Sequence, residues 1–149
     1  MYEFLDYQAR DVMSEKPLTI GPDATLADLE ATFEEHDFNS LPVLDKEGAI
    51  VGLVTKLDLL RAFQYDDDHI FPPYEEIMHR SVRSVMSREV LYVVPRTPLT
   101  RVLARLIETG SKSLPVLDDD DRLVGIVARE DVMRGLRRAV SGEKPTSPD

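Results

Sequence analysis

The residues of this 149-residue chain that could recognise a ligand gather in one short stretch, Gly52–Asp58. Thr55 and Asp58 stand three positions apart, where an apolar strand is expected to pass into a helix. The Thr55 hydroxyl could meet a phosphate at the helix N-terminus, because free N–H groups and the positive end of the helix dipole favour an anion there. The Asp58 carboxylate could accept hydrogen bonds from hydroxyl groups of such a ligand. Lys56 would add a local cation, and Gly52 would let the strand approach a neighbour or a ligand closely.

The same stretch also fits a purely structural role. Threonine followed three positions later by aspartate, just before an apolar run, has the pattern of a helix capping box. Thr55 would then be the N-cap residue, and such a cap alone stabilises a helix by about 0.5–2 kcal/mol. The two roles are compatible, since an aspartate at this position need not use both oxygens on the backbone. Ligand binding and capping therefore both remain open interpretations.

The stretch belongs to a unit that occurs twice. Displacing the sequence by 73 positions aligns residues 9–63 with residues 82–136 without a gap, and 20 of these 55 positions are identical. The longest identical run is S-L-P-V-L-D, which begins at Ser40 in the first copy and at Ser113 in the second. Self-similarity of this kind indicates a duplicated structural unit.

The two copies differ where the chemistry is expected. The second junction reads Gly125–Asp131; it keeps Asp131 but has Ala128 in place of Thr55. Arg129 could partly replace the lost hydroxyl donor, whereas Glu130 adds a negative charge. We therefore expect two similar sites of unequal strength, with the first the better one.

Each copy has the same predicted order of elements, β-α-β-β-α. A short strand comes first, and a helix follows whose apolar residues recur at helical spacing, most clearly over residues 99–107. Thr25 with Asp28, and Thr97 before Pro98, supply the expected helix starts. Two strands joined by a polar turn come next, and a second helix begins near Thr55 or Ala128. The predicted strands are residues 18–20, 41–44 and 50–54 in the first copy and residues 91–94, 114–117 and 123–127 in the second.

The domain boundaries follow from the repeat: residues 9–63 form the first domain and residues 82–136 the second. Residues 64–81 form a linker in which a loop containing Asp66–Asp68 and Phe71 precedes a connecting helix from Tyr74 towards Val85. Residues 137–149 form a C-terminal tail, partly disordered over the polar end from Ser141.

Composition narrows the function classes. The net charge of −10 disfavours nucleic acid and anionic membranes as partners. No apolar run approaches the roughly 20 residues of a membrane helix, and the N-terminus lacks the features of a secretory signal. The chain has no Cys, its three His residues are scattered, and no nucleophile motif or P-loop is present. We expect a cytoplasmic protein without a metal site or enzymatic activity.

The ordered set V-M-S, L-P-V-L-D and G-L-V-T-K-L-D-L-L, found twice at a constant offset, resembles the cystathionine β-synthase (CBS) domain. Such domains occur in pairs called Bateman modules, and the resemblance covers about residues 9–136. It implies an α/β (α+β) fold in which two β-α-β-β-α repeats pack sheet to sheet about a pseudo-twofold axis. Two clefts are then expected between the copies.

The resemblance also implies a regulatory role without catalysis. CBS pairs bind adenosine-containing ligands such as AMP, ADP, ATP, S-adenosylmethionine, NAD-type molecules or cyclic dinucleotides, so an adenine nucleotide is the expected ligand. They commonly form homodimers through their helices and regulate a partner protein, which this sequence does not identify. The alternative is a dimerisation or scaffolding module that binds no ligand.

Further site residues are implied by the same resemblance. The strand before the first helix would flank the base, and the residues around the L-P-V run would line the other side. For Leu41 and Pro42, burial in a strand core is the competing interpretation. These flanking residues are Thr19, Ile20, Asn39, Ser40, Leu41 and Pro42 in the first copy and Tyr92, Val93, Lys112, Ser113, Leu114 and Pro115 in the second.

Overall fold

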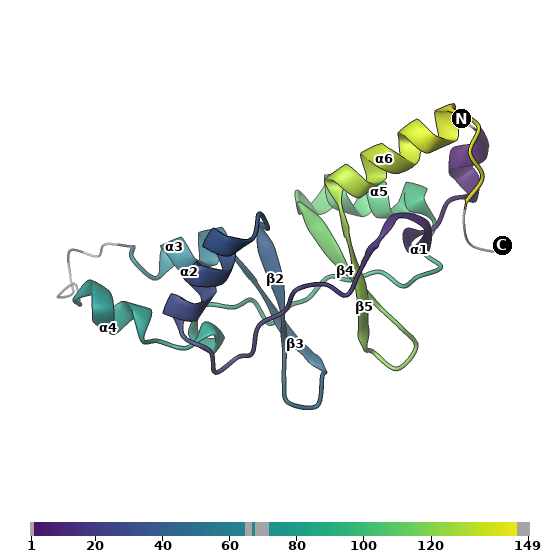
Figure 1. The fold of residues 1–149 in the computed structure, drawn as a ribbon. Coiled ribbons are helices and arrows are strands. Elements are labelled where there is room, and N and C mark those ends of the chain that lie inside the picture. The colour runs from purple at the N-terminus through teal and green to yellow at the C-terminus, as the bar shows by residue number, and fades with distance from the viewer. Residues whose placement is uncertain (1, 65–66, 68–71, 146–149) are drawn as a thin grey trace. The chain divides into compact units, whose positions relative to one another are not determined.

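The structure, a computed structural model, describes residues 2–64, 67 and 72–145 (Figure 1). The chain forms two compact units: unit 1 comprises Met1–Pro17 and Leu91–Asp149, and unit 2 comprises Leu18–Val90. These units are not the sequence repeats. Residues 9–17 of the first repeat belong to the unit of the second, and residues 82–90 of the second repeat belong to the unit of the first. Each compact unit is therefore assembled from both repeats.

Unit 2 is built on an antiparallel hairpin of β2 (Ser40–Leu44) and β3 (Ile50–Thr55), with Ser40 opposite Thr55. Isolated bridges extend the hairpin on both sides: Ile20 pairs in parallel with Val43, and Ser87 pairs antiparallel with Leu53. The remaining elements are helical and pack with the hairpin around a common core (Figure 1). They are α2 (Leu26–Glu35), α3 (Lys56–Arg61), α4 (Tyr74–Met78) and the 3₁₀ turn η2 (Val82–Ser84).

The apolar periodicity of the sequence explains the core of unit 2. Leu26, Leu29 and Phe33 recur at the spacing of one helix face, and all three are buried against Val43 and Val54 of the hairpin. The predicted start of α2 is confirmed: the Thr25 Oγ1 accepts the Asp28 N–H at 3.1 Å, and the Asp28 carboxylate accepts the Thr25 N–H at 3.1 Å.

Unit 1 has the equivalent hairpin, β4 (Ser113–Leu117) and β5 (Leu123–Ala128), with the short strand β1 (Ser14–Glu15) on the far side of β5. Val93 pairs in parallel with Val116, as Ile20 does with Val43 in unit 2. Its helices are α1 (Ala9–Val12), α5 (Leu99–Thr109), α6 (Arg129–Val140) and the 3₁₀ helix η1 (Tyr2–Asp6). The mixture of helices and antiparallel strands in both units confirms the α+β class.

The N-terminal segment is part of the core of unit 1. Tyr7 is fully buried, and its hydroxyl donates to the carbonyl of Glu143 at 3.0 Å. The Arg138 guanidinium lies 5.4 Å from the Tyr7 ring centroid and donates to the Asp11 carbonyl at 3.2 Å. Arg134 likewise donates to the Val12 carbonyl at 3.2 Å. These two arginines of α6 therefore anchor the chain that precedes β1.

Two glycines explain how each hairpin accepts its neighbouring segment. A Cβ built on Gly52 would lie 2.7 Å from the Met86 Sδ and 2.9 Å from the Ser87 carbonyl oxygen. A Cβ on Gly125 would meet the Sδ of Met13 and the carbonyl oxygen of Ser14 at the same two distances. The close approach predicted for Gly52 is therefore made by the V-M-S segment of the other repeat.

Several local predictions differ from the structure. The predicted first strands are reduced to single bridges at Ile20 and Val93. Thr97 does not cap α5: its Oγ1 accepts the Val94 N–H, and Pro98 holds the N-cap position. The predicted connecting helix is split into α4 and η2, because the Arg80 carbonyl between them accepts the Leu26 N–H at the start of α2.

The predicted linker and tail are described in part. Of the predicted linker loop, Asp66, Asp68 and Phe71 lie outside the described residues, as do 146–149 of the predicted tail. The first residues of that tail are helical, since α6 continues through Val140. Near the end of this helix, Arg138 is bonded to the Glu143 carboxylate at 2.8 Å and to the Asp11 carbonyl of the N-terminal segment.

Candidate ligand site

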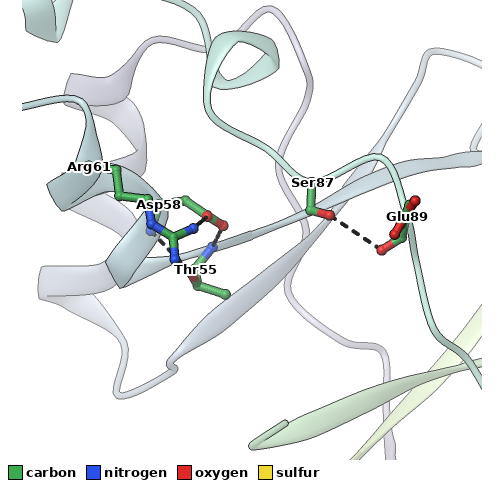
Figure 2. A network of polar contacts seen from close by, with 5 residues as sticks. All are labelled: Thr55, Asp58, Arg61, Ser87 and Glu89. Carbon is green, nitrogen blue, oxygen red and sulfur yellow. Dashed lines mark hydrogen bonds and ion pairs between the residues drawn. The ribbon is translucent and has the colours of Figure 1, made fainter. Parts of the chain in front are cut away.

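The predicted site begins where β3 passes into α3. The Thr55 N–H donates to the Asp58 Oδ2 at 2.8 Å, and the Asp58 N–H donates to the Thr55 Oγ1 at 3.1 Å (Figure 2). Thr55 is extended, with φ −116° and ψ 167°, as an N-cap residue should be. The capping interpretation of the T-x-x-D pattern is thus confirmed.

The second carboxylate oxygen of Asp58 has a different partner. Arg61, one turn further along α3, places its Nη1 3.3 Å from the Asp58 Oδ1 (Figure 2). The Asp58 side chain is 12% exposed and that of Arg61 is 64% exposed. The arginine end of the pair thus lies in solvent, which screens the interaction in part, whereas the carboxylate end is largely buried. Oδ1 is therefore the Asp58 oxygen that a ligand can reach by displacing one exposed side chain.

Backbone N–H groups at this junction are already bonded. Besides the N–H groups of Thr55 and Asp58, the Lys56 N–H donates to the Asn39 carbonyl at 3.2 Å. The Thr55 hydroxyl proton remains available to a phosphate, because Oγ1 acts as the acceptor in the capping box.

The junction of unit 1 repeats half of this arrangement. The Ala128 N–H donates to the Asp131 Oδ2 at 2.7 Å, and Arg134 pairs with the Asp131 Oδ1. Ala128 has a methyl group where Thr55 has its hydroxyl, so it can neither accept the Asp131 N–H nor donate to a ligand. Arg134 is also bonded to the Val12 carbonyl, and this second bond makes it harder to displace than Arg61.

Arg129 and Lys56 both turn towards helices of their own units. The Arg129 guanidinium donates to the carbonyls of Gly110 and Ser111 at 2.9 and 3.1 Å and so closes the C-terminal end of α5. The Lys56 Nζ lies 5.9 Å from the centroid of the Phe33 ring. Both cations are therefore directed at other groups of their own units. To bind a phosphate as predicted, each would have to change its rotamer.

The structure brings part of the flanking set together. Ser40 pairs with Thr55 across the hairpin, and the carbonyl of the preceding Asn39 bonds the Lys56 N–H. The Ile20 N–H donates to the Pro42 carbonyl at 3.1 Å, and in unit 1 the Val93 N–H donates to that of Pro115 at 3.0 Å. Within each unit, these residues therefore lie on the same small sheet as the junction.

Burial separates the remaining flanking residues into two groups. Leu41, Val93 and Leu114 are almost fully buried in the two cores, and Pro42 and Pro115 are buried beside them. Tyr92 is 44% exposed, and Thr19 and Ser113 are half-buried. The side chains of the first group pack inside their units, whereas those of the second group have surface available to a ligand.

A pocket of about 510 Å³ lies elsewhere in unit 2, between α2, α3 and α4. Phe33, Leu59, Phe63 and Met78 make it largely apolar, and Glu30 and Glu34 stand among its lining residues. Lys56 lines this pocket, but Thr55 and Asp58 do not. Apart from Lys56, the pocket shares no lining residue with the predicted site.

Sequence reasoning missed the two arginines that pair with the junction aspartates. The signal was present, since the D-x-x-R spacing of Asp58 with Arg61 recurs in Asp131 with Arg134. Residues three apart on a helix face each other, so this pairing could have been predicted.

Among the described residues, no three His, Asp or Glu side chains gather as a metal site, and no helix combines the length and apolar character of a membrane span.

Solved structures with the same architecture include two that hold adenosine compounds. One is the crystal structure of CBSX2 of Arabidopsis thaliana in complex with AMP. It is 27% identical in sequence, with a TM-score of 0.78 over 90% of this chain and 98% of that chain. The other is the CBS domain pair of protein MJ0100 in complex with 5′-methylthioadenosine and S-adenosyl-L-methionine. It is 25% identical in sequence, with a TM-score of 0.71 over 86% of this chain and 98% of that chain.

Relatives in sequence include both short proteins and parts of enzymes. A CBS domain-containing protein of Dictyostelium discoideum is 27% identical over 93% of this chain and 97% of its own length. The L-aspartate semialdehyde sulfurtransferase of Methanocaldococcus jannaschii is 26% identical over 84% of this chain, which spans 22% of that enzyme. The CBS domain profile matches twice, over residues 9–65 and 82–138. The resemblance seen in the sequence is confirmed: the chain belongs to the CBS domain family, as a tandem pair.

Proposed function

We propose that this chain is a regulatory module that binds an adenosine-containing nucleotide in the cleft between its two repeats. The observation that carries the proposal is the state of Asp58: one oxygen is fixed by the capping box, and the other faces an exposed arginine. The adenosine ligands named for the CBSX2 and MJ0100 structures support the same ligand class.

In the proposed site, the Asp58 Oδ1 accepts the ribose hydroxyls and Arg61 swings out towards solvent. The Thr55 hydroxyl donates to a phosphate, which is favourable because a charge-assisted hydrogen bond is stronger than a neutral one. Thr19, Ile20, Ser40 and the backbone of Pro42 flank the base. Leu41 shapes the site through its strand, since its side chain is buried in the core.

The second site is proposed to be weaker. Asp131 is available as Asp58 is, but Ala128 supplies no hydroxyl and Arg134 is held by a second bond. Tyr92, Val93 and the Ser113–Pro115 segment would flank the base, with Arg129 reaching a phosphate only after it leaves the end of α5. We expect this site to favour adenosine compounds without a phosphate.

The module would act in the cytoplasm without catalysing a reaction itself. We propose that it forms a homodimer through its helices, and that ligand binding changes how it contacts a regulated protein. A ligand-free dimerisation or scaffolding module is the second candidate. It is favoured by the fact that the capping bonds already use one oxygen of each junction aspartate, and that the N–H groups of Thr55, Lys56 and Asp58 are all bonded within the protein.

Thermal unfolding with a panel of AMP, ADP, ATP, S-adenosylmethionine, NADH and cyclic dinucleotides separates the two candidates. A ligand at 100 times its dissociation constant stabilises the folded state by about 2.7 kcal/mol. We expect at least one adenosine compound to raise Tm. A panel in which no compound raises Tm favours the scaffolding candidate.

The variant that tests the site is Asp58→Asn, because its amide oxygen can still accept the Thr55 N–H while its NH₂ group cannot accept a ribose hydroxyl. Asp28→Asn is the matched control, since Asp28 occupies the same capping geometry at the start of α2. We expect Asp58→Asn to lower affinity at least tenfold and Asp28→Asn to leave it unchanged. Equal affinity for the two variants would place the ligand elsewhere.

A further inference from the structure

The pocket between α2, α3 and α4 of unit 2 has a chemistry that the proposed nucleotide site does not use. Its volume of about 510 Å³ lies within the range of about 300–1,000 Å³ that is usual for pockets of small organic ligands. Among the described residues, its lining combines aromatic rings with two carboxylates and one ammonium group on an otherwise aliphatic surface. The residues that carry these groups are Phe33, Phe63, Tyr74, Glu30, Glu34 and Lys56.

The aromatic rings offer their faces to the pocket from three elements. Phe33 lies on the buried side of α2 and is only 8% exposed, whereas Phe63 follows the end of α3. The Phe63 ring stacks on that of Tyr74 at the start of α4, with the ring centroids 5.6 Å apart and the ring planes at 26°. The face of an aromatic ring attracts apolar groups and also cations, because its π-electrons make it negative.

The carboxylates of the pocket stand along one side of α2. Glu30 and Glu34 are four positions apart, so they are neighbours on the helix surface, and both are exposed. The Tyr74 hydroxyl donates to the Glu30 Oε2 at 3.1 Å, which ties this carboxylate to the aromatic side of the pocket. Within the part of the chain that the structure describes, neither glutamate pairs with a basic side chain. Two such negative charges beside an apolar pocket attract a cation.

Lys56 shows how an ammonium group meets these rings. Its Nζ lies 5.9 Å from the centroid of the Phe33 ring, and its charge leaves the described lining with a formal charge of −1, from two glutamates and one lysine. A cation over an aromatic face is attracted by the ring. A side chain of the protein therefore already makes the contact that a cationic ligand would make.

The second repeat provides an internal comparison, because its helices and hairpin have the same order. None of the acidic and aromatic residues that the first repeat gives to the pocket recurs at the 73-residue offset. The positions of Glu30, Phe33, Glu34 and Phe63 are held by Leu103, Leu106, Ile107 and Leu136. Aliphatic residues thus satisfy the fold at these positions, so helix packing does not by itself require the rings and carboxylates of unit 2.

We propose that this pocket is a binding site for an organic cation, a molecule with a protonated amine on an aromatic or other apolar body. The body packs against the Phe33 and Phe63 rings, and the ammonium group lies beside the two glutamates and displaces Lys56 from the Phe33 ring. An anion would be repelled by Glu30 and Glu34, and a neutral molecule would gain only the apolar contact. The inference uses neither Thr55 nor Asp58, so it goes beyond the proposed nucleotide site and can fail independently of it.

Three probes of similar shape test the charge of the ligand. 3-Phenylpropylamine is a cation at pH 7, 3-phenyl-1-propanol has the same body without a charge, and 3-phenylpropionate is an anion. In isothermal titration calorimetry of the full chain, we expect the amine to bind at least tenfold more tightly than the alcohol, and the anion to bind most weakly. Amine binding no tighter than alcohol binding, or tightest binding of the anion, would overturn the proposal.

Three variants separate the pocket carboxylates from the general negative charge of the chain. Glu34→Gln should weaken amine binding at least threefold and leave alcohol binding unchanged. Glu35→Gln is the matched control, since Glu35 is the next residue of α2, is exposed and does not line the pocket. Lys56→Met should tighten amine binding at least twofold, because it removes the competing ammonium group. Equal effects of the two glutamate variants, or weaker amine binding to Lys56→Met, would contradict the proposed site.

The methyl signals of the methionines locate the bound amine. Met78 lines the pocket, whereas Met13 and Met86 pack beside Gly125 and Gly52. In NMR spectra of protein labelled at the methionine methyl groups, we expect the Met78 signal to shift with the amine titration and those of Met13 and Met86 to stay in place. A titration that moves another methionine and leaves Met78 unchanged would place the amine elsewhere.

A second copy of the chain is the other possible occupant, because the proposed homodimer forms through helices. Light scattering at the concentration of the titration decides between the two occupants. We expect the amine to bind with one equivalent per chain whether the chain is monomeric or dimeric. A dimer that binds no amine would mean that the second copy covers the pocket, and a monomer that binds none would leave the pocket without the proposed ligand; either result refutes the site.

Discussion

Thr55 and Asp58 bond each other twice at the start of α3, through the Thr55 N–H to the Asp58 Oδ2 at 2.8 Å and the Asp58 N–H to the Thr55 Oγ1 at 3.1 Å. At the equivalent position of unit 1, the Ala128 N–H makes the first of these bonds to Asp131, and the alanine methyl cannot make the second. The chain therefore contains a complete capping box and a half-complete one in the same structural context.

This difference predicts that Ala128→Thr stabilises the protein. The new hydroxyl would accept the Asp131 N–H, and a good N-cap contributes about 1 kcal/mol. Ala128 already has the extended backbone of an N-cap, with φ −100° and ψ 168°, so no rearrangement is needed. Urea denaturation should show a rise of about 0.5–1 kcal/mol in the free energy of unfolding. Thr55→Ala is the reciprocal variant and should lower it by a similar amount; an unchanged value for both would refute the capping account.

The pairing of Asp58 with Arg61 predicts an effect on affinity. If the ribose displaces Arg61 from the Asp58 Oδ1, then Arg61→Met removes the competitor. The Arg61 end of the pair is exposed, and a solvent-screened pair is worth about 0.2–1 kcal/mol, so adenosine should bind about 1.5 to 5 times more tightly to the variant. Isothermal titration calorimetry with adenosine avoids any contribution of Arg61 to a phosphate. Weaker adenosine binding would instead make Arg61 a contact residue of the ligand.

Short-range patterns made much of this structure predictable. Thr25 with Asp28 correctly predicted the start of α2, and the polar turns between apolar runs correctly predicted both hairpins. Long-range pairing was harder, because nothing in residues 9–17 shows that Ser14 pairs with Ile126 rather than with the strands of its own repeat. The same limit applies to Arg129, whose partners Gly110 and Ser111 lie almost 20 positions earlier in the sequence.

The long-range pairing makes a prediction at Gly52 and Gly125. A methyl group at either position would meet a methionine Sδ at 2.7 Å and a backbone carbonyl oxygen at 2.9 Å. The methionine could move, but the carbonyl belongs to a paired strand segment and cannot move without loss of its hydrogen bonds. Gly52→Ala and Gly125→Ala should each cost about 1–3 kcal/mol in the free energy of unfolding. Gly21→Ala is the control, since a Cβ there meets nothing within 4 Å.

The hydrogen bond made by Tyr74, the first residue of α4, predicts a spectroscopic signature. Its hydroxyl donates to the Glu30 Oε2 at 3.1 Å. This hydrogen bond raises the pKa of Tyr74 above its ordinary value of 10.0, with further contributions from desolvation and from the negative charge of Glu30.

Glu30→Gln should therefore lower the pKa of Tyr74 towards 10.0. A carboxylate favours the neutral phenol both as an acceptor and through its charge, and glutamine retains only a neutral acceptor. Because the folded-state pKa is the higher one, the contribution of Tyr74 to stability is present below pH 10 and is lost as the pH rises through the raised pKa. Absorbance of the phenolate during an alkaline titration measures the shift, and Tyr74→Phe identifies which of the tyrosine transitions belongs to Tyr74. If Glu30→Gln leaves that transition in place, the hydrogen bond to Glu30 is not what holds the proton on Tyr74.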